Sequence, residues 1–157
     1  MQNSQRVRKP RGMTALKTGA RVVAYEYGML KEGLRWRASL RTSASTSSQT
    51  TENAAIEVTL KHARNLLSFF STGGWSDDVK MCDYLVHPPR IALPYLRKNR
   101  KRLNRKLAHP TYSRSRLSSE WNSRAIEAEI DDAIRGFLER LACDEPRLRR
   151  LFEIHGL

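Results

Sequence analysis

Residues 51–70 read TENAAIEVTLKHARNLLSFF, and their apolar side chains recur at helical spacing. One stripe runs along a single side of such a helix and consists of Ile56, Leu60, Ala63, Leu67 and Phe70. A second stripe lies roughly opposite and consists of Val58, His62, Asn65 and Phe69. A helix that is apolar on two sides is surrounded by other helices. The spacing therefore predicts that residues 52–70 form the central helix of an all-α bundle.

Two polar side chains interrupt the second stripe one turn apart, and they define a candidate pocket. In one interpretation, His62 and Asn65 are hydrogen-bonded to a neighbouring helix inside the core, as buried polar groups usually are. In the other, they line a cavity together with His109 and nearby arginines. The candidate pocket residues are His62, Arg64, Asn65 and Arg114. Under the second interpretation His62 and His109 approach each other across the bundle.

The rest of the chain predicts about five helices in one domain, because 157 residues suffice to bury a single core. We expect residues 1–12 to be a disordered basic tail and residues 13–157 to form the bundle, with residues 42–51 as a flexible Ser/Thr-rich loop. The other helices are expected at residues 14–41, from Ser76 to Pro88, from Pro94 to His109, from Ser118 or Ser119 past Leu141, and from Asp144 onward.

Local signals refine these boundaries. Glycines at positions 28 and 33 weaken the first helix and predict a kink or break between them. Thr50 or Thr51 is expected to cap the central helix. Ser76, followed by two aspartates, is expected to cap the next one.

The composition predicts a cytosolic protein. Both cysteines, Cys82 and Cys143, lie among apolar neighbours, which favours free and buried thiols. No apolar run approaches the roughly 18 residues of a membrane span, so we expect no membrane insertion. The basic N-terminal segment lacks the apolar stretch of a secretory signal peptide.

The most unusual stretch is RKNRKRLNRK, residues 97–106, which contains seven positive charges in ten residues. The whole chain carries a formal net charge of +13, so a polyanion is a natural partner. A positively charged helix face binds phosphates and releases their counterions. The predicted nucleic-acid contacts are Arg97, Lys98, Arg100, Lys101, Arg105 and Lys106. The alternative is a solvated face, or one neutralised by the acidic helix that follows.

No metal or cofactor site is predicted. None of the four histidines has the spacing of a zinc ligand to a cysteine or another histidine. The sequence also lacks a phosphate-cradling glycine loop and a nucleophile elbow.

Three segments resemble a family of small helical bacterial proteins: YEYGML at residues 25–30, residues 53–70 with HARNLLSFF, and NRKLAHPTYSR at residues 104–114. The helix pattern and the segment ending in His109 further resemble the HEPN superfamily. That resemblance implies a helical bundle, often dimeric, and in many members a metal-independent RNase of a toxin–antitoxin or phage-defence system. An antitoxin-like protein partner or a homodimer is therefore also expected.

The HEPN signature places an arginine four to six residues before a histidine. Here Arg102 stands six residues before His109, so the resemblance implies that these two are the catalytic residues, with His109 transferring the proton and Arg102 stabilising the phosphorane. Leu103 and Pro110 depart from the usual neighbours of the signature. Three functions stay open: a non-catalytic nucleic-acid-binding bundle, a HEPN-type RNase, and a protein-interaction bundle without nucleic acid.

Overall fold

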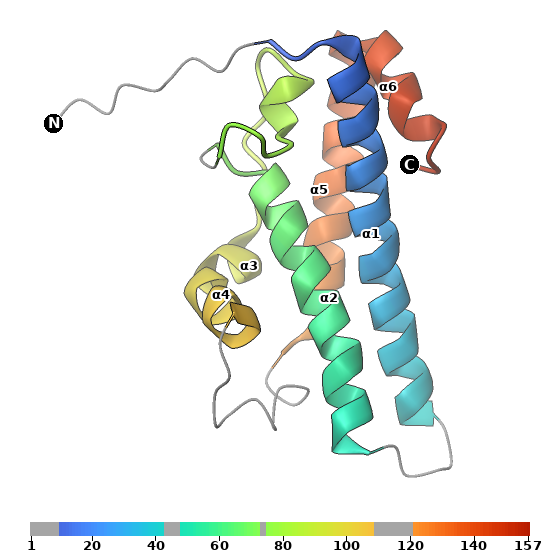
Figure 1. The fold of residues 1–157 in the computed structure, drawn as a ribbon, viewed down its shortest axis with the longest axis vertical. Coiled ribbons are helices and arrows are strands. Elements are labelled where there is room, and N and C mark those ends of the chain that lie inside the picture. Colours follow the sequence, from blue (N-terminus) through green and yellow to red (C-terminus); the bar gives the residue numbers. More distant parts are fainter. Residues whose placement is uncertain (1–9, 43–47, 73–74, 109–120) are drawn as a thin grey trace, which may run out of the picture.

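The computed structural model describes residues 10–42, 48–72, 75–108 and 121–157, without the side chains of Lys106 and Ala108. These residues form six α-helices and one 3-10 helix and contain no strand, which confirms the predicted all-α bundle. The long helices are α1 (Met13–Thr42), α2 (Gln49–Phe69) and α5 (Ser123–Asp144), and the short ones are α3 (Pro94–Lys98), α4 (Arg100–Ala108) and α6 (Pro146–Glu153). Figure 1 shows α1 running against α2 and α5, with α3 and α4 beside α2.

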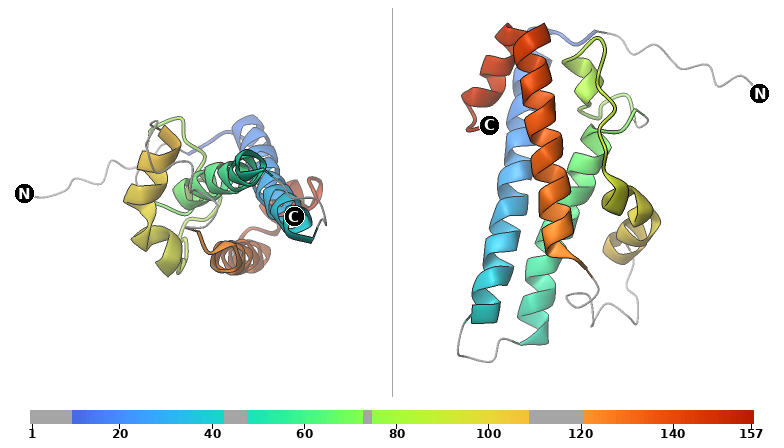
Figure 2. Two further views of the ribbon diagram at one scale, coloured as in Figure 1. Left: turned by 90° about the horizontal axis from the view of Figure 1, so that it is seen from below. Right: turned by 180° about the vertical axis from the view of Figure 1, so that it is seen from behind.

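Helix α2 is the central element, as its two apolar stripes predict. It contacts α1, α3, α4 and α5. The end-on view of Figure 2 places α3 and α4 on the side of α2 away from α1. Ile56, Leu60 and Ala63 have no exposed surface, and His62 of the second stripe is also buried. Both stripes of α2 therefore face other parts of the bundle.

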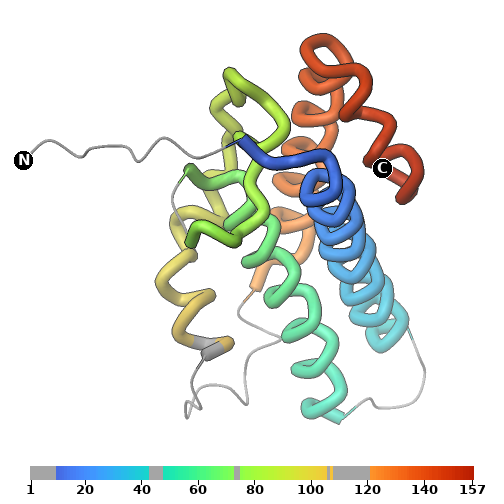
Figure 3. The backbone as a smooth tube through the Cα atoms, turned by 45° about the horizontal axis from the view of Figure 1, so that its top comes forward, coloured from blue at the N-terminus to red at the C-terminus, as the bar shows by residue number. Residues whose placement is uncertain are grey.

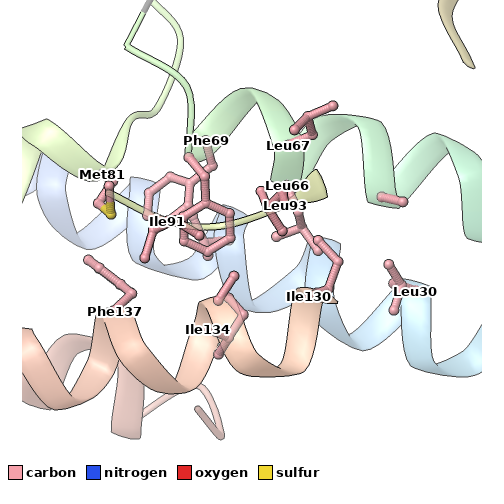
Figure 4. Packing of buried hydrophobic residues seen from close by; sticks show 14 of the residues in the cluster. Leu30, Leu66, Leu67, Phe69, Met81, Ile91, Leu93, Ile130, Ile134 and Phe137 are labelled. Carbon is pink, nitrogen blue, oxygen red and sulfur yellow. The ribbon is translucent and has the colours of Figure 1, made fainter. Parts of the chain in front are cut away.

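The core continues from α2 into α5 and α6. Figure 4 shows Leu66, Leu67 and Phe69 of α2 opposite Ile130, Ile134 and Phe137 of α5. The stripe predicted for α5 is buried along its whole length; it consists of Ile126, Ile130, Ala133, Phe137 and Leu141. Pro146 occupies the first turn of α6, where its missing N–H leaves no hydrogen bond unmade.

Helix α1 is continuous from Met13 to Thr42, so the helix does not break near the glycines, which was one of the two predicted outcomes. A Cβ added to Gly33 would lie 2.6 Å from the Thr59 Oγ1 atom and 2.9 Å from the Thr59 backbone nitrogen. Around Gly28, by contrast, a Cβ would meet no atom within 4 Å. Gly33 therefore allows α1 and α2 to approach each other closely, and packing between the two helices outweighs the low helix propensity of glycine.

These two glycines give a matched test. Gly33→Ala is expected to lower the free energy of unfolding by about 1–3 kcal/mol, because the added methyl group overlaps atoms of α2. Gly28→Ala is expected to raise it by about 0.5–1 kcal/mol, because alanine is the better helix former at this exposed position. Urea denaturation of both variants measures the difference. Equal stabilisation by both substitutions would contradict the close helix contact.

The segment after α2 is not the predicted α-helix from Ser76 to Pro88. It contains only a 3-10 helix, η1 (Met81–Asp83). Two carboxylates accept hydrogen bonds from backbone N–H groups of this segment. Asp78 accepts from the Trp75 N–H at 3.0 Å, and Asp83 accepts from the Lys80 N–H at 2.8 Å. Acidic side chains that bond nearby backbone N–H groups in this way compete with helix formation.

A buried lysine fixes this segment against α2. The Lys80 ammonium donates to the carbonyl oxygen and to the hydroxyl of Ser68, both at 2.7 Å, and lies 3.1 Å from the Asp78 carboxylate. Its side chain is 1% exposed. The ammonium thus satisfies a carbonyl at the C-terminal end of α2, where the last carbonyls have no intrahelical donor.

Several other boundaries and environments differ from the predictions. Ser48 caps α2 in place of Thr50 or Thr51, and its hydroxyl accepts from the Thr51 N–H at 3.2 Å. Residues 49–51 are therefore helical, which shortens the predicted loop over residues 42–51. Both cysteine thiols are free as predicted, but Cys82 and Cys143 are exposed and not buried.

The start of α5 and the N-terminal segment also differ. Asn122 caps α5 through its side-chain oxygen, which accepts from the Ala125 N–H at 3.1 Å; the predicted caps Ser118 and Ser119 lie outside the described residues. Arg11 belongs to the predicted disordered tail, yet it bonds the Ser76 carbonyl and lies 3.7 Å from the Asp83 carboxylate. Figure 3 shows this segment passing close to the connection that follows α2.

Candidate nucleic-acid interface

The candidate interface is the outer face of α3 and α4, which the sequence predicts as one helix. The structure divides it at Asn99, whose side-chain amide donates to the Tyr95 carbonyl at 2.8 Å. Leu96 and Leu103 have no exposed surface and anchor α3 and α4 to the bundle. The opposite side is polar throughout and basic.

We call the exposed basic side chains of this segment the basic face: Arg97, Lys98, Arg100, Lys101 and Arg105. No carboxylate of the described residues lies within ion-pair distance of any of them. The sequence carries no acidic residue between Asp83 and Glu120, so local charge does not compensate them either. The side chain of Lys106, the sixth predicted contact, lies outside the described residues.

The acidic residues of α5 do not neutralise the basic face, which was the competing interpretation of the sequence. Glu127 and Asp131 both bind the Lys31 ammonium of α1, at 2.5 and 2.9 Å. Burial lowers the pKa of Lys31, but the hydrogen bonds to the two carboxylates outweigh it and the pKa is raised. Asp132 pairs with Arg135 on its own helix.

Glu129 of α5 does contact α3, but through the backbone. Its two carboxylate oxygens accept from the N–H groups of Tyr95 and Leu96, at 2.5 and 3.0 Å. The Tyr95 hydroxyl in turn accepts from the Asn122 N–H at 3.0 Å. A carboxylate at the first turn of a helix satisfies donors that have no intrahelical partner. This contact positions α3 on α5 and leaves the charged side chains of the basic face in solvent.

Arg102 differs from the other basic residues of α4. Its guanidinium carbon lies 4.8 Å from the centre of the Trp121 ring, and Trp121 is buried. A guanidinium stacked on an aromatic face is held in place by a cation–π interaction. Of the two predicted catalytic residues, Arg102 is thus fixed against the bundle, whereas His109 lies outside the described residues.

The predicted pocket residues meet a partner that the sequence analysis missed. His62 Nδ1 donates to the Glu26 carboxylate at 2.6 Å, and the Asn65 amide donates to the same oxygen at 3.0 Å. The His62 ring also contacts the edge of Tyr25, with 5.8 Å between ring centres. Tyr25 and Glu26 are the first two residues of the YEYGML segment, which resembles the bacterial family described above. Their place in that segment is the one feature of the sequence that could have indicated a role for Glu26.

Of the other predicted pocket residues, the structure describes only Arg64, which is half-buried on α2 and makes no hydrogen bond in this cluster. Arg114 and His109 lie outside the described residues. The proximity of His62 and His109 stays a prediction. The cluster of Glu26, His62 and Asn65 joins α1 to α2, and it satisfies polar groups that the helix contact would otherwise leave buried without partners.

The cluster predicts a measurable stability effect. Glu26→Ala is expected to lower the free energy of unfolding by about 1–3 kcal/mol, because it leaves the His62 and Asn65 donors without their acceptor. Glu32→Ala is the control: the exposed Glu32 pairs with Arg35 of its own helix, the only ion-pair partner it has within the described part of the chain, and its loss is expected to change stability by less than about 0.5 kcal/mol. Equal effects of the two substitutions in thermal unfolding would contradict a structural role for the cluster.

Within the described part of the chain, no group of three or more His, Cys, Asp or Glu side chains is arranged to hold a metal ion. None of the helices described is both long and apolar enough to cross a membrane. Comparison of the chain with protein-family models, curated proteins and solved structures gave no match.

Proposed function

We propose that this protein binds RNA or another nucleic acid through the basic face of α3 and α4. The observation that carries the proposal is the set of five exposed cations that have no ion-pair partner among the described residues, on a segment anchored by Leu96 and Leu103. Lysine and arginine side chains presented together contact successive phosphates, and the released counterions supply much of the affinity. The alternative of a protein-interaction bundle without nucleic acid leaves this concentration of charge unexplained.

The salt dependence of binding tests this proposal. Fluorescence anisotropy with a labelled single-stranded RNA is expected to show an affinity that falls linearly with salt on logarithmic axes. If all five side chains contact phosphates, the logarithm of the binding constant falls with the logarithm of the salt concentration with a slope of about −3 to −4. Each contact with a single strand contributes roughly −0.7 to this slope. Absence of binding at low salt would show that the basic face serves another purpose.

A HEPN-type RNase is a second candidate, and the position of Arg102 favours it. A residue that stabilises charge developing on a phosphate has to be held at a fixed point. Arg102 is held over Trp121, unlike the exposed side chains around it. In this proposal His109 exchanges a proton with the ribose 2′-hydroxyl or the leaving 5′-oxygen, and no metal ion takes part.

The nuclease proposal predicts a specific pattern of activity. RNA cleavage is expected to persist in EDTA and to be lost in both His109→Ala and Arg102→Ala, while Arg105→Ala, at an exposed position of the same helix, retains cleavage at high RNA concentration. Denaturing gels of labelled RNA measure the products. RNA that stays intact with the wild-type protein would leave binding without catalysis as the function.

A further inference from the structure

A groove lies next to the basic face, where the C-terminal end of α2 meets the connection to α3. Its volume is about 600 Å³, within the range of sites that hold small organic groups. Its apolar lining comes from Leu67, Phe70, Met81, Pro88, Pro89 and Ile91. Figure 4 labels Leu67, Met81 and Ile91, which come from three different segments. The groove therefore offers an apolar floor large enough for a planar ring.

Three arginines border this floor. Arg90, Arg97 and Arg100 line the groove, are exposed, and have no ion-pair partner among the described carboxylates. None of the described residues that line the groove is acidic. An apolar floor with a positively charged rim is complementary to a group that joins a flat, weakly polar ring to an anion.

The rim is continuous with the basic face, because Arg97 and Arg100 belong to both. A chain of phosphates that follows the basic face therefore reaches the groove. Ser71 and Thr72 add hydroxyl groups to the lining. The Ser71 hydroxyl donates to the Leu67 carbonyl at 2.6 Å, whereas Thr72 is exposed at the mouth. A polar group at the mouth suits the hydrogen-bonding edge of a nucleobase.

We infer that the groove receives one unpaired nucleobase, while the adjoining phosphates lie on Arg90, Arg97 and Arg100. This inference rests on the proposed nucleic-acid binding and specifies its substrate class as a single strand. In a duplex the bases are stacked and paired, so none enters a groove without unpairing. In a single strand a base turns out freely and gains apolar contact, which typically contributes about 1–3 kcal/mol per base at such sites.

The test compares three RNA probes of one length in anisotropy titrations at one salt concentration. The probes are a single strand, its duplex, and a single strand of the same charge in which every nucleotide is abasic. The wild-type protein is expected to bind the single strand about tenfold more tightly than either of the others, because only that probe has both phosphates and free bases.

Two matched variants locate the effect. Thr72→Glu places a carboxylate at the mouth of the groove, and Thr50→Glu makes the same change in the first turn of α2, about 30 Å away along the helix. Both positions are exposed, so both variants are expected to fold, and circular dichroism checks this. Thr72→Glu is expected to remove the preference for the single strand, and Thr50→Glu to retain it.

The outcomes separate the two proposals. Salt-dependent binding that is equal for all three probes would leave the basic face as the interface and overturn the groove as a base site. An equal preference for the single strand in Thr72→Glu and Thr50→Glu would also overturn the groove as a base site. Failure of every probe to bind at low salt would overturn the proposed function, and the groove inference with it.

Discussion

Phe137→Ala is expected to lower the free energy of unfolding by about 3–5 kcal/mol, as the truncation of a fully buried phenylalanine typically does. Phe137 has no exposed surface and lies where α2, α5, α6 and the segment after α2 meet. Its ring centre lies 5.2 Å from that of Phe69, 5.1 Å from Phe152, 6.1 Å from Tyr84 and 6.5 Å from Phe70. Truncation removes all four edge-on ring contacts and leaves a cavity that none of these elements fills alone.

Thermal unfolding followed by circular dichroism measures this effect. For a chain of this length, 1 kcal/mol shifts the melting temperature by about 2–4 °C, so a decrease of roughly 10 °C is expected. Trp75→Ala is the control, since Trp75 is also aromatic but 81% exposed, and its loss is expected to change stability by less than about 0.5 kcal/mol. A Phe137→Ala variant as stable as Trp75→Ala would show that the aromatic cluster does not hold these elements together.

The parts of the fold that follow from helical periodicity could be predicted from the sequence. The stripes of α2 and α5 are regular, and each buried residue lies where the repeat places it. The segment after α2 could not be predicted in this way, because its apolar residues fit a helical repeat while its polar ones do not. Lys80 reads as a surface residue in any sequence pattern, yet it is buried because two oxygen atoms of Ser68 and the Asp78 carboxylate surround its ammonium.

In the candidate site, too, the periodicity of one helix does not predict which residue elsewhere in the chain a polar side chain contacts. The interruption of the second stripe by His62 and Asn65 correctly indicates a polar contact between helices, but it contains no information on the partner. Glu26 is that partner because α1 and α2 pack against each other at one relative position along their axes. The close approach of the two helices at Gly33 helps to fix this register. A pairing between residues far apart in the sequence depends on this register, and the periodicity of a single helix does not specify it.

The structure also decides between two interpretations of the charge pattern in α5. From the sequence, its carboxylates could neutralise the basic segment that precedes them. Three of them instead bind α1 or the backbone of α3, so they stabilise the bundle. Glu129 in particular stabilises the position of the basic face without lowering its charge. The positive face therefore persists beside an acidic helix.

Replacing Arg100, Lys101 and Arg105 together by glutamine is expected to weaken RNA binding on the order of 100-fold near 50 mM salt. Glutamine retains a polar side chain, and all three positions are exposed, so the fold is expected to remain intact. For the triple variant, the slope of the logarithm of the binding constant against the logarithm of the salt concentration is expected to be less negative by about 2. The reason is that three fewer phosphates are neutralised and fewer counterions are released. Anisotropy titrations between 50 and 200 mM salt measure both quantities.

The matched control separates contact from overall charge. Replacing Lys17, Arg21 and Arg147 by glutamine also removes three positive charges from a net charge of +13, at exposed positions on α1 and α6. Long-range attraction depends on net charge, whereas the release of condensed counterions depends on direct contact with phosphates. The control variant is therefore expected to keep the wild-type slope and to lose less than about threefold in affinity. Equal losses in the two variants would mean that RNA is attracted by the whole protein and not bound by the basic face.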